Sequence, residues 1–215
     1  MLSFLFPRKC ILCRSLLSNK ETDLCHNCRK NVETYSHSKR TIPFVAQSTA
    51  IWYYKGDVRK SIQRFKFHNA RSYADAYGRF LAMKLQEEMW EDVDIITWTP
   101  ISFIRRIVRG YDQSKLLAQA TAKELGTTPV ATLKKVRHTP PQSSISEAAA
   151  RRANVLGAYK VRNPDVVSGK RILLLDDVVT TGSTVSECAK TLLTAGAKEV
   201  RLATIATTSY DKKSR

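Results

Sequence analysis

The segment from Ile172 to Thr184 constrains the fold of this chain more than any other part of the sequence. It reads Ile-Leu-Leu-Leu-Asp-Asp-Val-Val-Thr-Thr-Gly-Ser-Thr. Its apolar start predicts a strand that is buried on both faces, as in a parallel sheet. Two carboxylates, Asp176 and Asp177, follow at the carboxyl end of this strand, where open α/β sheets bind their ligands. The segment therefore predicts a parallel sheet with a ligand site at its edge.

The loop after the two carboxylates has the composition of an anion-binding turn. Backbone N–H groups, hydroxyls and the positive end of the following helix favour a phosphate, and Gly182 lets the backbone approach closely. Adjacent carboxylates suit sugar hydroxyls and a hydrated Mg²⁺ ion. A plain strand–turn–helix, whose polar residues only cap the helix, accounts for Ser183 or Thr184. It gives no reason for paired acids beside a buried strand.

The same segment resembles the phosphoribosyl pyrophosphate (PRPP) motif of type I phosphoribosyltransferases, an apolar strand followed by an acidic pair and T-T-G-S-T. It differs from a Walker A loop because it lacks the GK[ST] ending. The resemblance implies that the acids Asp176 and Asp177 are catalytic, holding the ribose hydroxyls and Mg²⁺, and that the loop holds the 5′-phosphate. The PRPP-binding residues it implies are Asp176, Asp177, Thr180, Thr181, Gly182, Ser183 and Thr184.

Four of the five cysteines form two pairs, Cys10-x-x-Cys13 and Cys25-x-x-Cys28. Two such pairs supply four soft ligands in a tetrahedral arrangement, which is typical of a closed structural zinc site. Two disulfides are the alternative, but no secretion signal precedes the pairs, and a reducing compartment disfavours them. We expect Cys10, Cys13, Cys25 and Cys28 to bind Zn²⁺ in a small ribbon. Cys188 lies on the apolar side of a predicted helix, and we expect it to pack in the core.

The rest of the chain alternates strand and helix patterns, which favours an α/β fold with a parallel sheet flanked by helices. The expected strands are 50–54, 94–98, 131–136, 171–175 and 199–206. The expected helices are 58–68, 73–89, 113–125, 183–195 and one that begins at 147 after Ser146. We predict a zinc-binding ribbon and linker in residues 1–44, a phosphoribosyltransferase-like domain in 45–208 and a basic tail in 209–215.

The chain is strongly basic, with 36 Lys and Arg against 19 Asp and Glu and a net charge of +17. The excess is spread over the whole chain, so no single tail accounts for it, and it favours an anionic partner. Two stretches, residues 52–67 and 105–111, combine basic and aromatic residues as single-stranded nucleic acid binding requires. In the first, however, it is equally consistent with the sequence that Trp52, Tyr54 and Phe65 are buried in the core. The second can serve the phosphate pocket instead. The candidate DNA-binding residues are Arg59, Lys60, Arg64, Lys66, Arg105, Arg106 and Arg109.

Several further motifs, taken in order with the cysteines and the PRPP motif, resemble the ComF family of bacterial competence proteins over almost the whole chain. They are Tyr54-Lys-Gly, Phe65-Lys-Phe67, Arg109-Gly-Tyr-Asp-Gln113, Arg137-His-Thr-Pro-Pro-Gln142 and Arg151-Arg-Ala-Asn-Val-Leu-Gly-Ala-Tyr159. The resemblance implies a role in natural transformation, in which the protein handles incoming single-stranded DNA in the cytoplasm with other competence proteins.

A second phosphate loop is implied by the same resemblance. In related transferases it holds the pyrophosphate, and its match here is Thr99-Pro-Ile-Ser102, with Pro100, Ile101 and Ser102 as its candidate residues. The family usually has Pro-Val-Pro-Leu-His there, so Ser102 replaces a histidine that could be cationic, which weakens the case for tight pyrophosphate binding. Arg137–Gln142 falls in the loop that closes over the substrate in such enzymes, and Pro140 and Pro141 stiffen it.

Two principal functions are consistent with these features. One is a DNA-handling competence protein that binds PRPP or another phosphoribosyl ligand. The other is an active Mg²⁺-dependent phosphoribosyltransferase whose acceptor the sequence does not indicate. A transcriptional regulator is a weaker alternative, because no helix-turn-helix pattern is evident. The apolar runs are too short to span a membrane, so we expect no membrane insertion.

Overall fold

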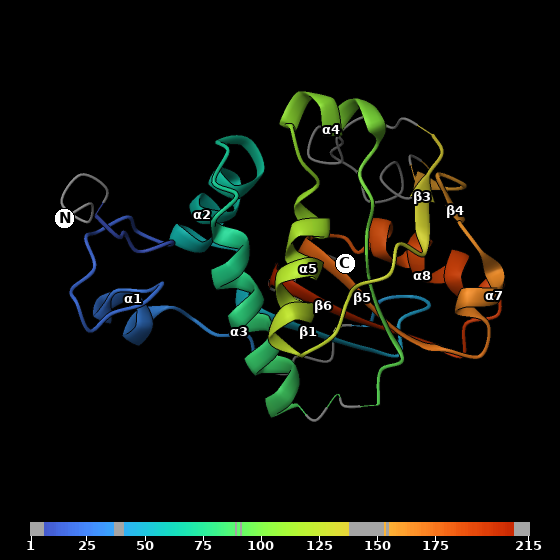
Figure 1. The fold of residues 1–215 in the computed structure, drawn as a ribbon, viewed down its shortest axis with the longest axis horizontal. Coiled ribbons are helices and arrows are strands. Elements are labelled where there is room, and N and C mark those ends of the chain that lie inside the picture. Colours follow the sequence, from blue (N-terminus) through green and yellow to red (C-terminus); the bar gives the residue numbers. More distant parts are fainter. Residues whose placement is uncertain are drawn as a thin grey trace, which may run out of the picture.

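The computed structural model describes residues 7–36, 41–88, 90, 92–137, 153 and 155–208. A parallel sheet in the order β1-β6-β5-β2 forms its centre (Figure 1). Its strands are β1 (Gln47–Tyr53), β2 (Ile95–Trp98), β5 (Arg171–Val179) and β6 (Glu199–Thr207). In register, Ile96 lies beside Leu173, and Leu173 beside Arg201. The predicted α/β fold with a parallel sheet is confirmed.

Helices cover both faces of this sheet, which explains the uninterrupted apolar run in β5. Leu173 and Leu175 belong to a buried cluster with α3 (Tyr73–Glu87) and α5 (Gln113–Glu124). Ile172 and Leu174 point to the opposite face, where they join a second cluster with α8 (Ser183–Thr194). Successive residues of a strand face opposite sides, so a strand between two helical layers must be apolar at every position.

The N-terminal ribbon segment, residues 7–36, does not have a separate core. Cys10, Ile11 and Leu12 share a buried cluster with Trp52 of β1 and Phe65 of α2 (Gly56–Phe67). The segment contains the short helix α1 (His26–Asn31), and in Figure 1 it lies at the far left, beside α2 and away from the sheet. Its last part is tied to the sheet by a bridge between Thr34 and Trp52. Tyr35, which lies within the predicted ribbon and linker, is buried, with 3% of its surface exposed.

Some elements differ from the sequence prediction. The predicted strand around 131–136 is β3 (Leu133–Lys135), but it pairs with β4 (Tyr159–Val161) in a separate antiparallel sheet. The helices α4 (Phe103–Arg109) and α7 (Pro164–Val167) were not predicted. The helix expected from 147, most of Arg137–Gln142 and the tail 209–215 lie outside the described residues. Within the described part of the chain, no helix is both long and apolar enough to cross a membrane.

Candidate functional site

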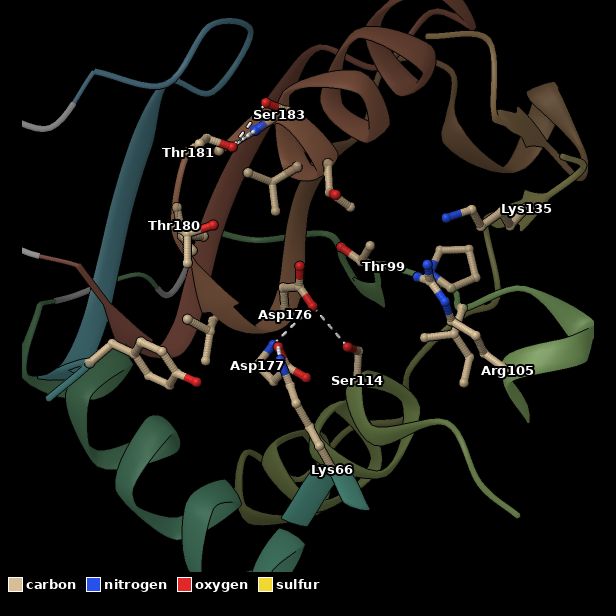
Figure 2. A pocket seen from close by; sticks show the side chains of 18 of the residues that line it. Lys66, Thr99, Arg105, Ser114, Lys135, Asp176, Asp177, Thr180, Thr181 and Ser183 are labelled. Atoms are coloured by element: carbon tan, nitrogen blue, oxygen red, sulfur yellow. Dashed lines mark hydrogen bonds and ion pairs between the residues drawn. The ribbon is translucent and has the colours of Figure 1, made fainter. Parts of the chain in front are cut away.

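The acidic pair and the loop after it open into one cavity of about 460 Å³, the acid-pair cavity, at the carboxyl end of β5 (Figure 2). Side chains from α2, α4, α5, β3, β4 and the β5–α8 loop line it. This is the position that the sequence pattern predicted for a ligand site in a parallel sheet. Figure 2 shows Asp176 at its centre, with Lys66 and Ser114 below and Thr180, Thr181 and Ser183 above.

Asp176 is buried at the base of the cavity and accepts two hydrogen bonds at Oδ1. One comes from the hydroxyl of Ser114 in α5 and the other from the backbone N–H of Asp177, both at 2.9 Å. Burial, followed by the neighbouring charge of Asp177, raises the pKa of Asp176 to about 7. Asp176 can therefore exchange a proton near neutral pH, as carboxylates at functional sites often do.

Asp177 pairs with a lysine from another element. The ammonium of Lys66, at the end of α2, lies 2.8 Å from Oδ1 of Asp177. Two hydrogen bonds hold the backbone around this lysine: the amide of Gln113 donates to the Lys66 carbonyl at 3.3 Å, and the Tyr111 hydroxyl donates to the Phe65 carbonyl. Lys66 thus enters the cavity on a backbone that α5 and the chain before it keep in place.

The loop 180–184 leads directly into α8 and lines the cavity. Gly182 has φ +82°, a left-handed conformation that favours glycine, and it is the N-cap residue of α8. The hydroxyls of Thr181 and Ser183 lie 3.0 Å apart. Backbone N–H groups, hydroxyls and the helix N-terminus thus share one wall of the cavity, as an anion-binding loop requires.

The opposite side of the cavity is cationic (Figure 2). Lys135 of β3 and Arg105 of α4 line it together with Tyr159 of β4, and the Lys135 ammonium lies 5.2 Å from the centre of the Tyr159 ring. Burial and the charge of Arg105 lower the pKa of Lys135 to about 8. Thr99, which is buried, lies between the two sides (Figure 2).

Of the three residues predicted for a pyrophosphate loop, two line the acid-pair cavity and one does not. Pro100 and Ile101 line the acid-pair cavity, and the Ile101 N–H donates to Oδ2 of Asp112 at 3.3 Å. Ser102 is buried, and its hydroxyl accepts a hydrogen bond from the Arg105 N–H at the start of α4. Ser102 therefore caps a helix that brings Arg105 to the cavity, so the loop gains a cation one turn after the position where the family usually has histidine.

The seven candidate DNA-binding residues separate into three groups. Four of them line the acid-pair cavity: Arg59, Lys66, Arg105 and Arg109. Arg64 donates to backbone carbonyls of the ribbon segment, whereas Lys60 and Arg106 are exposed. The aromatic residues also separate, because Trp52 and Phe65 are core residues while Phe67 and Phe103 are exposed. The side chain of Arg109 lies over the Phe67 ring at 4.8 Å and that of Arg106 over the Phe103 ring at 5.3 Å.

The four paired cysteines lie together. The sulfur atoms of Cys10, Cys13, Cys25 and Cys28 are all within 4.8 Å of one another, and none forms a disulfide. A closed set of four thiolates matches the donor preference of structural zinc. His26, between two of these cysteines, is exposed. Cys188 is fully buried in the cluster beneath α8, as predicted for a core residue.

Sequence patterns did not indicate several residues of the cavity as ligand-site residues. Ser114 and Lys135 lie in no motif, and Tyr159 ends a motif that did not indicate a ligand site. The three residues reach the cavity from separate elements whose relative positions depend on the fold. Lys66 was a candidate for DNA and not for this pocket. Two of the missed residues could have been found from their place next to a motif. Ser114 follows directly after the Arg109–Gln113 motif, and Thr99 is the first residue of the pyrophosphate-loop match.

Comparisons with known proteins agree with this geometry. A phosphoribosyl transferase domain family matches residues 112–215, and a double zinc ribbon domain family matches residues 1–39. The DNA utilization protein YhgH of Salmonella typhimurium is 30% identical over 222 residues, which cover 91% of this chain and 95% of that protein. This chain belongs to the ComF family. Competence protein F of Haemophilus influenzae is 28% identical over 94% of this chain and 97% of its own length.

Two further similarities are weaker. A ribose-phosphate pyrophosphokinase of Gloeobacter violaceus is 39% identical over 83 residues, 39% of this chain and 20% of that protein. Among solved structures, the allosteric regulatory enzyme of purine biosynthesis has a TM-score of 0.46 and 22% identity, covering 66% of this chain and 30% of that one. At this TM-score the likeness carries no weight. The fold assignment rests on the strand order and the two domain families.

Proposed function

We propose that this ComF family protein handles incoming single-stranded DNA in the cytoplasm during natural transformation, and that its cavity binds PRPP or another phosphoribosyl ligand. The observation that carries the proposal is the convergence of three unlike features on one cavity. These are the acid pair, the anion-binding loop 180–184 and a cationic wall opposite. The names of its relatives, competence protein F and DNA utilization protein, support the DNA role.

A phosphoribosyl ligand is complementary to this cavity from end to end. The ribose hydroxyls would be held by Asp176 and Asp177, and the 5′-phosphate by Thr180, Thr181, Gly182, Ser183 and Thr184. The pyrophosphate would lie toward the Lys135 and Arg105 side, across the cavity from the loop (Figure 2). Mg²⁺ would accompany PRPP through the pyrophosphate oxygens. The chain would thus combine a zinc-binding segment in 1–44 with a ligand-binding domain in 45–208.

Ligand-induced stabilisation tests the pocket. PRPP with Mg²⁺ should raise the melting temperature of the purified protein, because a ligand that binds only the folded state stabilises it. The double variant Asp176→Asn/Asp177→Asn should lose this shift, whereas Asp165→Asn, an exposed residue of α7, should keep it. No shift in the wild type, or an equal shift in the acid-pair variant, would overturn the pocket.

Titration of labelled oligothymidylate at several salt concentrations tests the DNA role. We expect log affinity to fall steeply with log salt, because arginines and lysines release counter-ions from the strand. Phe67 and Phe103, each exposed beneath an arginine, are the rings most suited to stack on bases. Phe103→Ala should weaken binding and Met83→Ala, at an exposed apolar site on α3, should not. A flat salt response would contradict the DNA role.

Active transfer is the second candidate, and the cationic wall favours it. Departure of pyrophosphate from C1 builds negative charge on the leaving group, which Lys135, Arg105 and Mg²⁺ would stabilise. Release of pyrophosphate from PRPP in the presence of candidate acceptors would establish this activity. Binding without release for every acceptor class tried would leave the ligand-binding function as the one the cavity performs.

A further inference from the structure

The ammonium of Lys66 lies beside the acid pair and supplies a positive charge that a metal ion would otherwise supply to these carboxylates. It lies 2.8 Å from Asp177, and the side chain is 21% exposed, so it is largely withdrawn from water. Its backbone is fixed by hydrogen bonds from Gln113 and, one residue earlier, from Tyr111. The fold therefore holds the Lys66 ammonium next to Asp177, and the ion pair is not a chance contact between solvent-exposed side chains.

The cavity also has an excess of positive charge without a metal. Two carboxylates line it, Asp176 and Asp177, against five basic side chains, Arg59, Lys66, Arg105, Arg109 and Lys135. The phosphate groups of a ligand carry the negative charge that these cations require. A divalent ion held directly by Asp177 would lie close to the Lys66 ammonium, which contacts the same carboxylate. Two positive charges bound to one carboxylate repel each other strongly in a partly buried site.

We propose that Lys66 is a specificity-determining residue that serves as the built-in counter-ion of the acid pair, so that the cavity binds a phosphoribosyl group without a divalent cation. The inference rests on the proposed function, since it concerns how the same ligand class is held. Lys66 keeps Asp177 neutralised while the carboxylates accept the ribose hydroxyls. Its two remaining N–H donors are available to the ligand, because an ammonium has three. Any Mg²⁺ that enters does so with the pyrophosphate of PRPP.

Ribose 5-phosphate is the probe that isolates this effect, because it has the ribose and 5′-phosphate but no pyrophosphate to carry Mg²⁺. Calorimetric titration of the full-length zinc-loaded protein would be done in Mg²⁺-free buffer and again in Mg²⁺. We expect the wild type to bind with nearly equal affinity in both. Lys66→Met should weaken metal-free binding at least about tenfold, because a charge-assisted contact is lost, and Mg²⁺ should restore part of it.

Two further variants separate this role from a structural one. Lys66→Arg keeps the positive charge and should keep metal-free binding, whereas Lys123→Met, at an exposed lysine near the end of α5, controls for loss of a charge elsewhere. The pH profile gives an independent readout. Ribose 5-phosphate binding should increase as Asp176 ionises, and the midpoint should move to higher pH in Lys66→Met, because the nearby cation lowers the pKa of Asp176.

The outcomes are distinct. Binding of ribose 5-phosphate by the wild type only when Mg²⁺ is present would overturn the counter-ion role and leave the proposed function standing. Equal metal-free binding by wild type and Lys66→Met, with the same pH midpoint, would also overturn it. Failure to bind in both buffers, with PRPP also failing, would remove the proposed function and this inference together.

Discussion

The guanidinium of Arg64 donates from Nη2 to the carbonyl oxygen of Ile11 at 2.9 Å. It also donates to the carbonyl of Leu12, and the Ser61 hydroxyl donates to that of Ile11. Ile11 and Leu12 are the two residues between Cys10 and Cys13. Helix α2 is thus fastened to the first cysteine turn through Ser61 and Arg64, while Lys66, in the same last turn as Arg64, reaches the acid-pair cavity. A metal site and a ligand site are joined by a single helix.

Arg64→Met should separate the ribbon segment from α2. Methionine keeps the aliphatic length but leaves the Leu12 carbonyl without its donor and the Ile11 carbonyl with only the Ser61 hydroxyl, which should cost about 1–3 kcal/mol of unfolding free energy. Urea denaturation monitored by circular dichroism measures it. Lys60→Met, exposed on the same helix, should change stability far less, because an exposed ion pair with Asp57 contributes little. Equal effects of the two substitutions would contradict the docking role of Arg64.

Removal of zinc should destabilise the whole domain and not only the N-terminus. The cysteines and the residues between them share one buried cluster with Trp52 and Phe65, so loosening the ribbon exposes core side chains. We expect about one Zn²⁺ per chain, and a loss of at least about 10 °C in melting temperature on chelation, in one transition. Metal analysis and calorimetry measure these. Far less than one equivalent, or no thermal change on chelation, would exclude a structural zinc site.

Local patterns were sufficient to predict the main elements. The run Ile172–Leu175 predicted β5, and the apolar spacing of 58–65 predicted α2, because burial imposes a periodicity that the sequence must carry. The acid pair and the loop 180–184 were also predictable, since they are contiguous. α4 was not predicted because Phe103, Ile104, Ile107 and Val108 are all more than half exposed, so no buried stripe marks it.

The cationic half of the site could not be derived in the same way. Lys135 and Arg105 line the same cavity because β3 lies outside the main sheet and pairs with β4. A local sequence pattern does not predict which distant segments pair. Lys66 looked like a nucleic-acid contact because its neighbours are basic and aromatic. Burial of Phe65 turns that part of α2 inward and takes Lys66 to Asp177.

Titration of Asp176 should make the ligand-free protein less stable as pH rises. Its pKa is raised from 3.8 to about 7 in the folded state, so the folded protein holds a proton that the unfolded chain has lost. Stability from this group is present below the lower value and is lost as pH rises through the upper one. Urea unfolding from about pH 5 to about pH 8 should show the wild type declining relative to Asp176→Asn. Parallel curves for the two proteins would be inconsistent with a raised pKa.

Gly182→Ala should impair the phosphate loop. The residue has φ +82°, and an added Cβ would touch Ile42 at 3.4 Å, so alanine should cost about 1–2 kcal/mol from the left-handed conformation. Gly169→Ala is a matched control, because it has φ +69° and open space around it, and it does not line the cavity. Both variants should lose similar stability, but only Gly182→Ala should weaken binding of ribose 5-phosphate. Equal binding by the two would argue against the loop as the phosphate site.

Lys135 should distinguish PRPP from ribose 5-phosphate. It lies on the side of the cavity opposite the phosphate loop, so Lys135→Met should weaken PRPP binding about tenfold and leave ribose 5-phosphate binding nearly unchanged. Lys134→Met removes an exposed lysine from the same strand and should affect neither ligand. Because the pKa of Lys135 is lowered to about 8, its charge is lost as pH rises through that value, and wild-type PRPP affinity should fall there while that of Lys135→Met stays level. Calorimetric titration on both sides of that pH measures this. A parallel decline in both proteins would show that Lys135 does not contact the pyrophosphate.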